Sequence, residues 1–293
     1  MYAVPALTLV ISVYQRARIL ELIFQSLENQ TWTDFEVVLA DDGSDASVAE
    51  IVRRWESRFR HPVRHVWQEN IGFRKTVIVN RAVAESAAEH LVFIDGDCIL
   101  HHRFLERHHA RRRPHHVLSG RRVMLDIELT ARLTLDDVRT LRIEHPSFWW
   151  RHAKAHDRRN GLYAPALYGW RGGWSREYAI LGSNFSLFRD DFLRVNGYDE
   201  GILGRGMEDI NLRTRLLNAG FAVRSISQEA LQYHCEHAAA PMPHDAETTQ
   251  RWRSTTESWT PRGIVKGERE TTLDGPHGTH HQEDPHASAR DRG

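Results

Sequence analysis

The sequence has 293 residues, of which 41% are hydrophobic, and its 39 Lys and Arg residues are balanced by 39 Asp and Glu residues. Such a chain can bury a substantial core in one large domain or two small ones. A formal net charge of zero gives no support to wholesale binding of nucleic acid, and only two cysteines, Cys98 and Cys235, argue against a disulfide scaffold and suit a reducing cytosol.

The N-terminal stretch, residues 1–14, is apolar but has no basic segment before its apolar part. Gln15 to Arg18 follow it directly, so we expect a first strand here and not a signal peptide. No apolar run approaches the roughly 18 to 20 residues that span a bilayer. We therefore expect a cytoplasmic protein that at most attaches to a membrane surface.

The first part of the chain alternates short apolar runs with segments whose apolar residues recur at helical spacing. Strands are predicted at residues 7–13, 35–40, 63–67 and 91–94, with helices at about 19–27, 48–55 and 77–83 between them. This alternation implies right-handed crossovers and a mainly parallel sheet, whose ligands gather at the carboxyl ends of its strands. The predicted fold class is therefore α/β, with helices flanking the sheet.

Two acidic clusters follow predicted strands. Asp41 to Asp45 come after the second strand, and Asp95-Gly96-Asp97 come after the fourth. The latter turn could hold a divalent cation, because carboxylate oxygens suit Mg²⁺ or Mn²⁺. It could equally be an Asp-Gly turn that closes a hairpin. The turn alone does not decide between a metal site and a hairpin corner.

The middle of the chain is less regular. A basic, histidine-rich helix is predicted at 104–113 and a strand at 117–125, but from 134 to 177 aromatic residues lie among many Arg and His. Such residues line sugar sites, bind membrane surfaces or pack a small subdomain, and packing is the simplest interpretation for any one of them. The aromatic and basic segment 148–154 could also touch a membrane that carries a lipid-linked acceptor.

A clear pattern returns in a predicted strand at 179–188. A glycine-rich loop then precedes Glu208 and Asp209, which open a helix that stops near Gly220. Short strands at 223–226 and 230–233 lead to His234-Cys235-Glu236-His237. After about residue 240 the chain is polar and lacks apolar periodicity, so residues 241–293 are expected to form a disordered tail.

Six stretches, taken in order, resemble motifs of the inverting glycosyltransferases of family two, which have the GT-A fold. They are VISVYQRARILELIFQSLENQT, FEVVLADDGSDAS, ENIGFRKTVIVNRAV, LVFIDGDCIL, LGSNFSLFRDDFLRVNGYDE and GRGMEDINLRTRLLNAGF. The last two look like the galactosyltransferase-type C-terminal region of bacterial polysaccharide and chondroitin-polymerase domains. The resemblance implies one domain over 1–240, with a nucleotide-binding half at 1–125 and an acceptor-binding half that carries the catalytic base at 126–240.

The resemblance also implies a metal site. Asp97 is expected to bind Mn²⁺ or Mg²⁺, and Asp95 to reach both the donor ribose and the metal shell. His234 is expected to complete the shell, because it follows a Tyr at a strand end and so matches the family better than His237. The cation would stabilise the charge that develops on the nucleoside diphosphate leaving group.

The base is expected in the Glu208-Asp209 pair. Inversion needs a carboxylate that takes the acceptor's proton, and Asp209 matches that position, with Glu208 orienting the acceptor or the base. The helix dipole is expected to depress the pKa of Asp209 and keep it ionised. A purely structural alternative exists, because acidic residues in a first helical turn are favoured without any catalysis.

Further substrate contacts follow from the same resemblance. Asp41 is expected near the nucleotide base and ribose, and Arg74 at the base edge or a phosphate. Lys75 either joins Arg74 or belongs to a solvated basic turn. The junction of donor sugar and acceptor is expected at Gly182 and Asn184, and Trp174 is a looser acceptor-site candidate, as are Trp170 and Arg171.

The predicted function is an inverting, metal-dependent hexosyltransferase that moves a sugar from a UDP-sugar to a carbohydrate or lipid-linked acceptor in glycan or polysaccharide biosynthesis. The alternative is a non-catalytic relative that binds a nucleotide or carbohydrate. A nucleotidyltransferase is disfavoured because SVYQRAR lacks the glycines of a phosphate loop.

Overall fold

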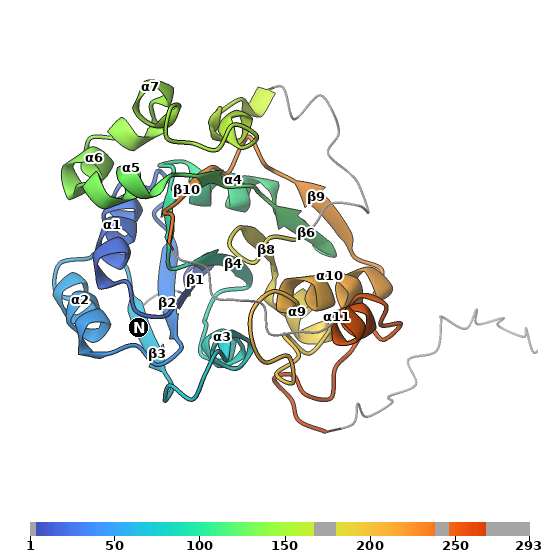
Figure 1. Ribbon diagram of the computed structural model, residues 1–293. Coiled ribbons are helices and arrows are strands. Elements are labelled where there is room, and N and C mark those ends of the chain that lie inside the picture. Colours follow the sequence, from blue (N-terminus) through green and yellow to red (C-terminus); the bar gives the residue numbers. More distant parts are fainter. Residues whose placement is uncertain (1–3, 167–179, 238–245, 268–293) are drawn as a thin grey trace, which may run out of the picture.

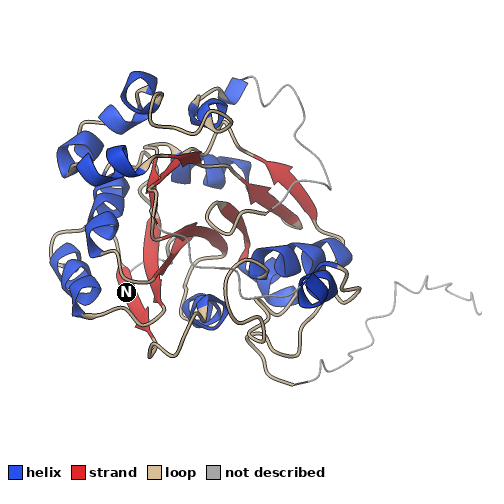
Figure 2. Ribbon diagram, viewed as in Figure 1, coloured by secondary structure: helices blue, strands red, loops and turns tan. Residues whose placement is uncertain are grey.

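A seven-stranded sheet forms the centre of the protein in the order β3-β2-β1-β4-β8-β6-β9. The computed structural model describes residues 4–166, 180–237 and 246–267 (Figures 1 and 2). Four strands lie parallel to one another: β1 (Leu7–Val13), β2 (Phe35–Asp41), β3 (Val63–Trp67) and β4 (His90–Asp95). β8 (Phe185–Phe188) runs antiparallel to its neighbours β4 and β6 (His116–Ser119), and β9 (Ala222–Ser225) lies parallel to β6. The prediction of a mainly parallel α/β sheet is confirmed.

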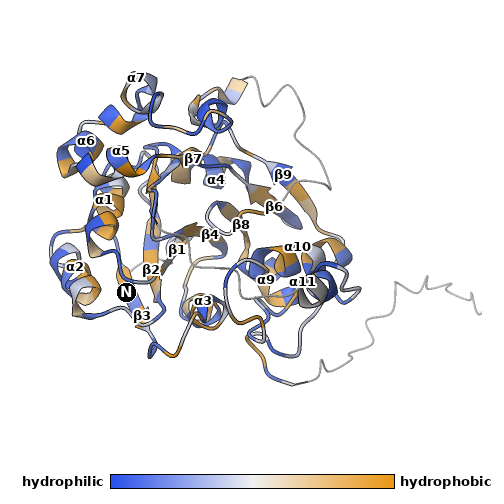
Figure 3. Cartoon of the chain, viewed as in Figure 1, coloured by the Kyte–Doolittle hydropathy of each residue, from blue (hydrophilic) through white to orange (hydrophobic). Residues whose placement is uncertain are grey.

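The core occupies both faces of this sheet, because successive side chains of a strand point to opposite sides. In β1, Leu9 and Ile11 pack with α1 and α2, whereas Val10 packs on the other face with α3, α9 and α10. Strands that are covered on both faces read as continuous apolar runs, which is why they were visible in the sequence. Figure 3 shows the hydrophobic residues concentrated in these central strands.

Helices cover the sheet on both faces. They are α1 (Ala17–Glu28), α2 (Ala46–Glu56), α3 (Lys75–Ala84), α4 (Phe104–Arg111), α9 (Arg189–Arg194) and α10 (Glu208–Asn218). Shorter helices follow one another in the chain: α5 (Ile127–Arg132), α6 (Leu135–Arg139), η1 (Arg142–Glu144), α7 (Pro146–Trp149) and η2 (Arg158–Gly161). Of these, α5 and α6 lie beside α1 (Figure 1). In this region Trp149 is fully buried and packs in the main core, as expected of a packing residue.

A second, three-stranded sheet brings together segments that lie far apart in the chain. It has the order β5-β10-β7, with β5 (Cys98–Leu100), β7 (Val123–Met124) and β10 (Gln232–His234). In the antiparallel pairing of β10 with β5, His234 lies opposite Cys98. The segment that follows β4 is thus placed beside the histidines near residue 235.

The strand predicted at 117–125 is two strands in two different sheets, β6 and β7. Between them, Gly120 donates its N–H to the carbonyl oxygen of Asn184 at 2.9 Å, and a Cβ on Gly120 would lie 2.3 Å from the Asn184 side chain. The close approach of these two segments turns the chain out of the large sheet. The strand predicted at 179–188 likewise begins only at Phe185, because Leu181 and Asn184 close a tight turn before it.

The C-terminal region differs from the disordered tail that was expected. Residues 246–253 form α11 (Ala246–Arg253), in which Trp252 packs with Ile202 and Met207. In the segment that follows, the Asn196 side chain donates to the carbonyl oxygens of Thr260 at 2.6 Å and Val265 at 2.7 Å. Polar contacts of this kind leave no apolar periodicity in the sequence. Residues 241–245 and 268–293 lie outside the described residues.

Among the residues that the structure describes, no helix is both long enough and apolar enough to cross a membrane.

Candidate active site

The Asp95-Gly96-Asp97 turn stands at the carboxyl end of β4. It is not a hairpin corner, because β4 pairs with β1 and β8 in the large sheet, whereas β5 pairs with β10 in the small one. Gly96 donates its N–H to the carbonyl oxygen of Ser12 at 2.7 Å, and a Cβ at this position would come within 3.0 Å of Val13. The turn is therefore pressed against the end of β1.

The Asp97 carboxylate faces two imidazoles. Its Oδ2 atom lies 2.9 Å from Nε2 of His237 and 3.3 Å from Nε2 of His234, while Sγ of Cys98 donates to its Oδ1 at 3.1 Å. Burial by itself would raise the pKa of Asp97, but the contacts with His234 and His237 outweigh it and hold that pKa well below its usual range. Asp97 is thus an ionised carboxylate with two converging nitrogen donors.

These three residues fit a divalent cation. Metal–ligand bonds of about 2.1 Å place neighbouring ligands of an octahedral ion about 3 Å apart, and the 2.9 and 3.3 Å separations match that spacing. The sequence favoured His234 over His237, yet the structure brings both to Asp97. The sequence did contain a signal for His237, because it lies only three residues after His234, which ends a strand.

A second histidine cluster has a different character. His101, His102 and Glu144 also offer three ligand atoms close together. However, Nδ1 of His101 accepts the backbone N–H of Arg103 at 3.1 Å, so the neutral ring carries its proton on Nε2, the atom that lies 3.3 Å from Glu144. Glu144 also accepts the backbone N–H of His102 at 2.6 Å. The cluster is therefore satisfied by its own hydrogen bonds.

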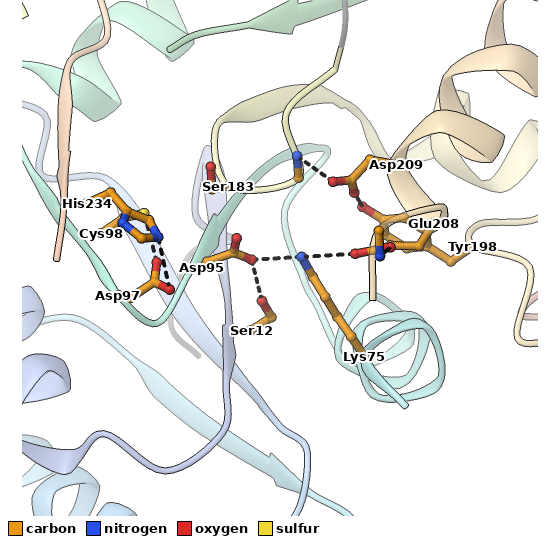
Figure 4. A network of polar contacts seen from close by, with 12 residues as sticks. Ser12, Lys75, Asp95, Asp97, Cys98, Ser183, Tyr198, Glu208, Asp209 and His234 are labelled. Carbon is orange, nitrogen blue, oxygen red and sulfur yellow. Dashed lines mark hydrogen bonds and ion pairs between the residues drawn. The ribbon is translucent and has the colours of Figure 1, made fainter. Parts of the chain in front are cut away.

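Asp95 points away from the histidines, toward a lysine. Its Oδ1 atom accepts a hydrogen bond from Ser12 Oγ at 2.9 Å and another from Lys75 Nζ at 2.7 Å. The same Nζ atom lies 3.9 Å from Oε1 of Glu208 (Figure 4). The two acidic groups that were predicted as separate parts of the site, Asp95 and Glu208, are thus joined through Lys75. That lysine is not in a solvated turn.

Asp209 is held from two sides at the start of α10. Gly182 donates its backbone N–H to Oδ2 at 2.9 Å, and the Tyr198 hydroxyl donates to Oδ1 at 3.1 Å. A Cβ on residue 182 would lie 2.3 Å from Oδ1, so only glycine lets the turn before β8 approach this closely. Gly182 therefore lies at the carboxylate that was predicted as the base.

The pKa of Asp209 differs from the expectation. The helix dipole was expected to depress it, but burial and the neighbouring Glu208 charge raise it to about 7, against the opposing charge of Lys75. Asp209 thus changes its protonation state near neutral pH.

The acidic residues after β2 are engaged within the protein. Asp41 is 1% exposed; its Oδ1 accepts the Ser44 N–H at 2.8 Å and its Oδ2 lies 2.8 Å from Nε2 of His65. Asp45 caps α2 by accepting the Ser47 N–H. Arg74 donates from its side chain to the carbonyl oxygen of Glu69 at 2.7 Å. In this state Asp41 and Arg74 shape the loops at this edge of the sheet.

Asn184 has a framework position in place of the substrate contact expected of it. It is completely buried, and its Nδ2 donates to the carbonyl oxygens of Arg121 at 2.9 Å and Ala230 at 3.1 Å. Its Oδ1 lies 3.1 Å from Nε2 of His108. Every polar atom of the side chain is thus committed to neighbouring segments. Trp174, Trp170 and Arg171 lie outside the described residues.

Comparison with known sequences decides the family. The description "Glycosyl transferase family 2" matches residues 8–158, just over half of the chain, and "N-terminal domain of galactosyltransferase" matches residues 171–238. The chain belongs to glycosyl transferase family 2. This agrees with the resemblance that its motifs indicated.

Two relatives illustrate the range of this family. A validoxylamine A glucosyltransferase of Streptomyces hygroscopicus subsp. jinggangensis is 28% identical over 255 residues, which cover 80% of this chain and 56% of the relative. A chondroitin synthase of Escherichia coli is 34% identical over 95 residues, which cover 32% of this chain and 14% of the relative. The chain thus spans about half the length of the glucosyltransferase and a small part of the synthase.

Solved structures show the same GT-A fold. A mannosyltransferase from Pyrobaculum calidifontis in complex with GDP-Man and Mn²⁺ superposes with a TM-score of 0.54 at 18% identity, over 80% of this chain and 57% of the other. TarS of S. aureus gives a TM-score of 0.52 at 16% identity, over 78% of this chain and 36% of the other. At these identities the likeness establishes the fold alone.

Proposed function

We propose that this family 2 domain is an inverting, divalent-metal-dependent hexosyltransferase that moves a sugar from a UDP-sugar to a carbohydrate or lipid-linked acceptor. The observation that carries the proposal is that Asp97, flanked by two imidazoles, is connected to the partly buried Asp209 side of the site through the contacts of Lys75 with Asp95 and Glu208. A metal group and a base on one edge of a nucleotide-sugar fold are the two parts that such a transfer requires.

Asp97, His234 and His237 would hold the cation. A bound divalent ion would neutralise the negative charge that develops on the departing nucleoside diphosphate. Imidazole suits transition metals better than Mg²⁺, and water and phosphate oxygens suit Mn²⁺, so we favour Mn²⁺ for this ligand set. The presence of Mn²⁺ in the complex of the Pyrobaculum mannosyltransferase supports this choice.

Asp209 would act as the base. Inversion in one displacement requires a carboxylate that accepts the proton of the acceptor hydroxyl as that oxygen attacks the anomeric carbon. A pKa of about 7 suits this task, because the group is then ionised in much of the population and still basic enough to take a proton. Gly182 and Tyr198 orient its two oxygens.

The donor and the setting are proposed from the family resemblance. UDP is the nucleotide that the motifs favour, and Asp41 and Arg74 would contact it after local rearrangement of their present hydrogen bonds. A role in polysaccharide biosynthesis fits the name of the chondroitin synthase relative, and a cytoplasmic setting is proposed from the low cysteine content. Trp150, which is 41% exposed, would supply a peripheral membrane contact to a lipid-linked acceptor.

The test measures release of UDP from a panel of UDP-sugars, with Mn²⁺ and carbohydrate acceptors, for the purified chain. Asp97→Ala and Asp209→Asn are each expected to lower kcat by about 100-fold or more, because one removes the metal ligand and the other the base. Asp136→Asn is the matched control, since Asp136 is an exposed acidic residue on α6. Full activity of both site variants would refute the proposal, and nucleotide binding without turnover on any donor would favour a non-catalytic relative.

A further inference from the structure

Lys75 lies at an unfavourable place for a lysine. It is the first residue of α3, where the helix dipole disfavours a positive charge, and its side chain is only 13% exposed. The residue before it is another cation, Arg74, whose own side chain makes no capping hydrogen bond to this helix end. Lysine is rarely buried without partners. The free-energy cost of placing a lysine at this helix end and removing it from water must be offset by its surroundings.

The compensation comes from carboxylates of two different elements. Nζ of Lys75 donates to Oδ1 of Asp95 at 2.7 Å, at the end of β4, and lies 3.9 Å from Oε1 of Glu208, at the start of α10. Oε2 of Glu208 accepts the backbone N–H of Gly206 at 2.7 Å, which leaves Oε1 turned toward the lysine. Figure 4 shows the ammonium group between these two carboxylates.

We propose that Lys75 is a positioning residue for the transfer, whose ammonium group ties Asp95 on the donor side to Glu208 and Asp209 on the acceptor side. The inference rests on the proposed function, because it assigns Lys75 a role toward the base of that reaction.

The rest of α3 supports this role. Asn80, on the same helix, accepts the backbone N–H of Tyr198 and donates to its carbonyl oxygen, both at 2.9 Å. Thr76 donates to the carbonyl oxygen of Ile202 at 3.4 Å. Since Tyr198 in turn holds Asp209, one helix fixes both the lysine and the segment that orients the base. The position of the ammonium and the position of the base are thus set by the same helix.

The position of the Lys75 ammonium affects the pKa of Asp209. Glu208 from α10 and Asp95 from β4 raise the pKa of Asp209, Lys75 from α3 lowers it, and the neutral hydroxyl of Tyr198 donates to its carboxylate. Lys75 is the cation that opposes two like charges. Without it, the carboxylate would hold its proton to higher pH, and less of the enzyme would have an ionised base at neutral pH.

The experiment records kcat/KM against pH for the full chain and for Lys75→Met and Lys75→Arg. In the wild type, activity should rise with pH through about 7, as Asp209 loses its proton. In Lys75→Met that rise should move up by about one pH unit, because an opposite charge a few ångströms away has been removed. Lys75→Arg, which keeps the positive charge, should have the same midpoint of the pH profile as the wild type. Arg81→Met, an exposed cation of the same helix, should leave the profile unchanged.

A purely structural lysine would give another result. Lys75→Met would then lose the same factor of activity at every pH, with an unmoved midpoint, and this would overturn the inference. Lys75→Gln, which keeps a polar side chain, replaces Lys75→Met if the latter does not fold, as judged by its thermal unfolding. If the wild type shows no turnover, or turnover that survives Asp209→Asn, the proposed function fails and the inference falls with it. Turnover that depends on Asp209, with an unmoved midpoint, overturns the inference alone.

Discussion

Asp209 shows that the environment of a single carboxylate can outweigh its place in a helix. A helix N-terminus stabilises a negative charge by about 0.3–1 kcal/mol, which is less than one pKa unit. Burial can raise the pKa of a carboxyl group by several units, and Glu208 adds a like charge beside it. Burial and the like charge have the larger effect, so the pKa of Asp209 lies near 7 and not below its usual value.

Gly182 provides a test of how closely the base must be held. In Gly182→Ala, the new Cβ would lie 2.3 Å from Oδ1 of Asp209, so the carboxylate must shift and its hydrogen bond from the residue 182 N–H must weaken. Misplacement of a reacting group by about 1 Å can lower the rate about 100-fold. We expect kcat to fall by roughly that factor, with little change in the affinity for UDP and Mn²⁺. Steady-state kinetics and calorimetry measure the two quantities, and an unchanged kcat would contradict the assigned role.

At the scale of an element, Asn196 makes several of the hydrogen bonds that hold the C-terminal segment. Asn196, which is 2% exposed, donates to the carbonyl oxygens of Thr260 and Val265 and accepts the Val265 N–H at 2.8 Å. The segment it secures also pairs Arg262 with Asp199 at 2.9 Å, next to Tyr198. The segment thus supports the loop from which the Tyr198 hydroxyl reaches the base.

Asn196→Asp replaces the amide that donates to Thr260 and Val265 with a carboxylate oxygen and leaves the rest of the side chain the same. The new carboxylate would face two carbonyl oxygens in a buried place, and we expect the free energy of unfolding to fall by about 2–3 kcal/mol. Asn218→Asp is the matched control, because Asn218 donates to the carbonyl oxygens of Thr255 and Glu257 but is exposed. That control should cost well under about 1 kcal/mol. Urea denaturation measures both variants, and equal losses would contradict a specific role for Asn196.

At the scale of the whole molecule, the proposed metal site of Asp97, His234 and His237 depends on the small sheet. Asp97 follows β4, whereas His234 and His237 come from a segment far along the chain, and the pairing of β10 with β5 and β7 brings them together. A ligand that binds this group in the folded state alone should therefore stabilise the entire fold.

Thermal unfolding with Mn²⁺ and UDP tests this dependence. At about 100 times Kd, binding adds about 2.7 kcal/mol, which for a domain of this size raises Tm by roughly 5–10 °C. Asp97→Ala should abolish the shift. His102→Gln should retain it, because His102 belongs to the second, hydrogen-bonded cluster. If His102→Gln lost the shift and Asp97→Ala kept it, the metal would bind at the second cluster instead.

The sequence by itself determined the features that local patterns encode. The strand at 7–13 and the acidic turns at strand ends were visible because buried parallel strands are continuous apolar runs with polar residues after them. The order of the motifs indicated the family, which the comparison confirmed. Glu208 was correctly placed in the first turn of its helix, because the stop at Gly220 and the apolar spacing are local signals.

Only the tertiary structure decided which of these residues meet. His237 joins His234 at Asp97, Asn184 turns into the framework, and Lys75, for which a nucleotide contact and a solvated turn were both open, lies between two carboxylates. Residues 254–267 pack through backbone and side-chain hydrogen bonds that have no periodic signature. Each of these outcomes depends on contacts between segments far apart in the chain, and burial, charge and pKa are set by those contacts and not by the residue types alone.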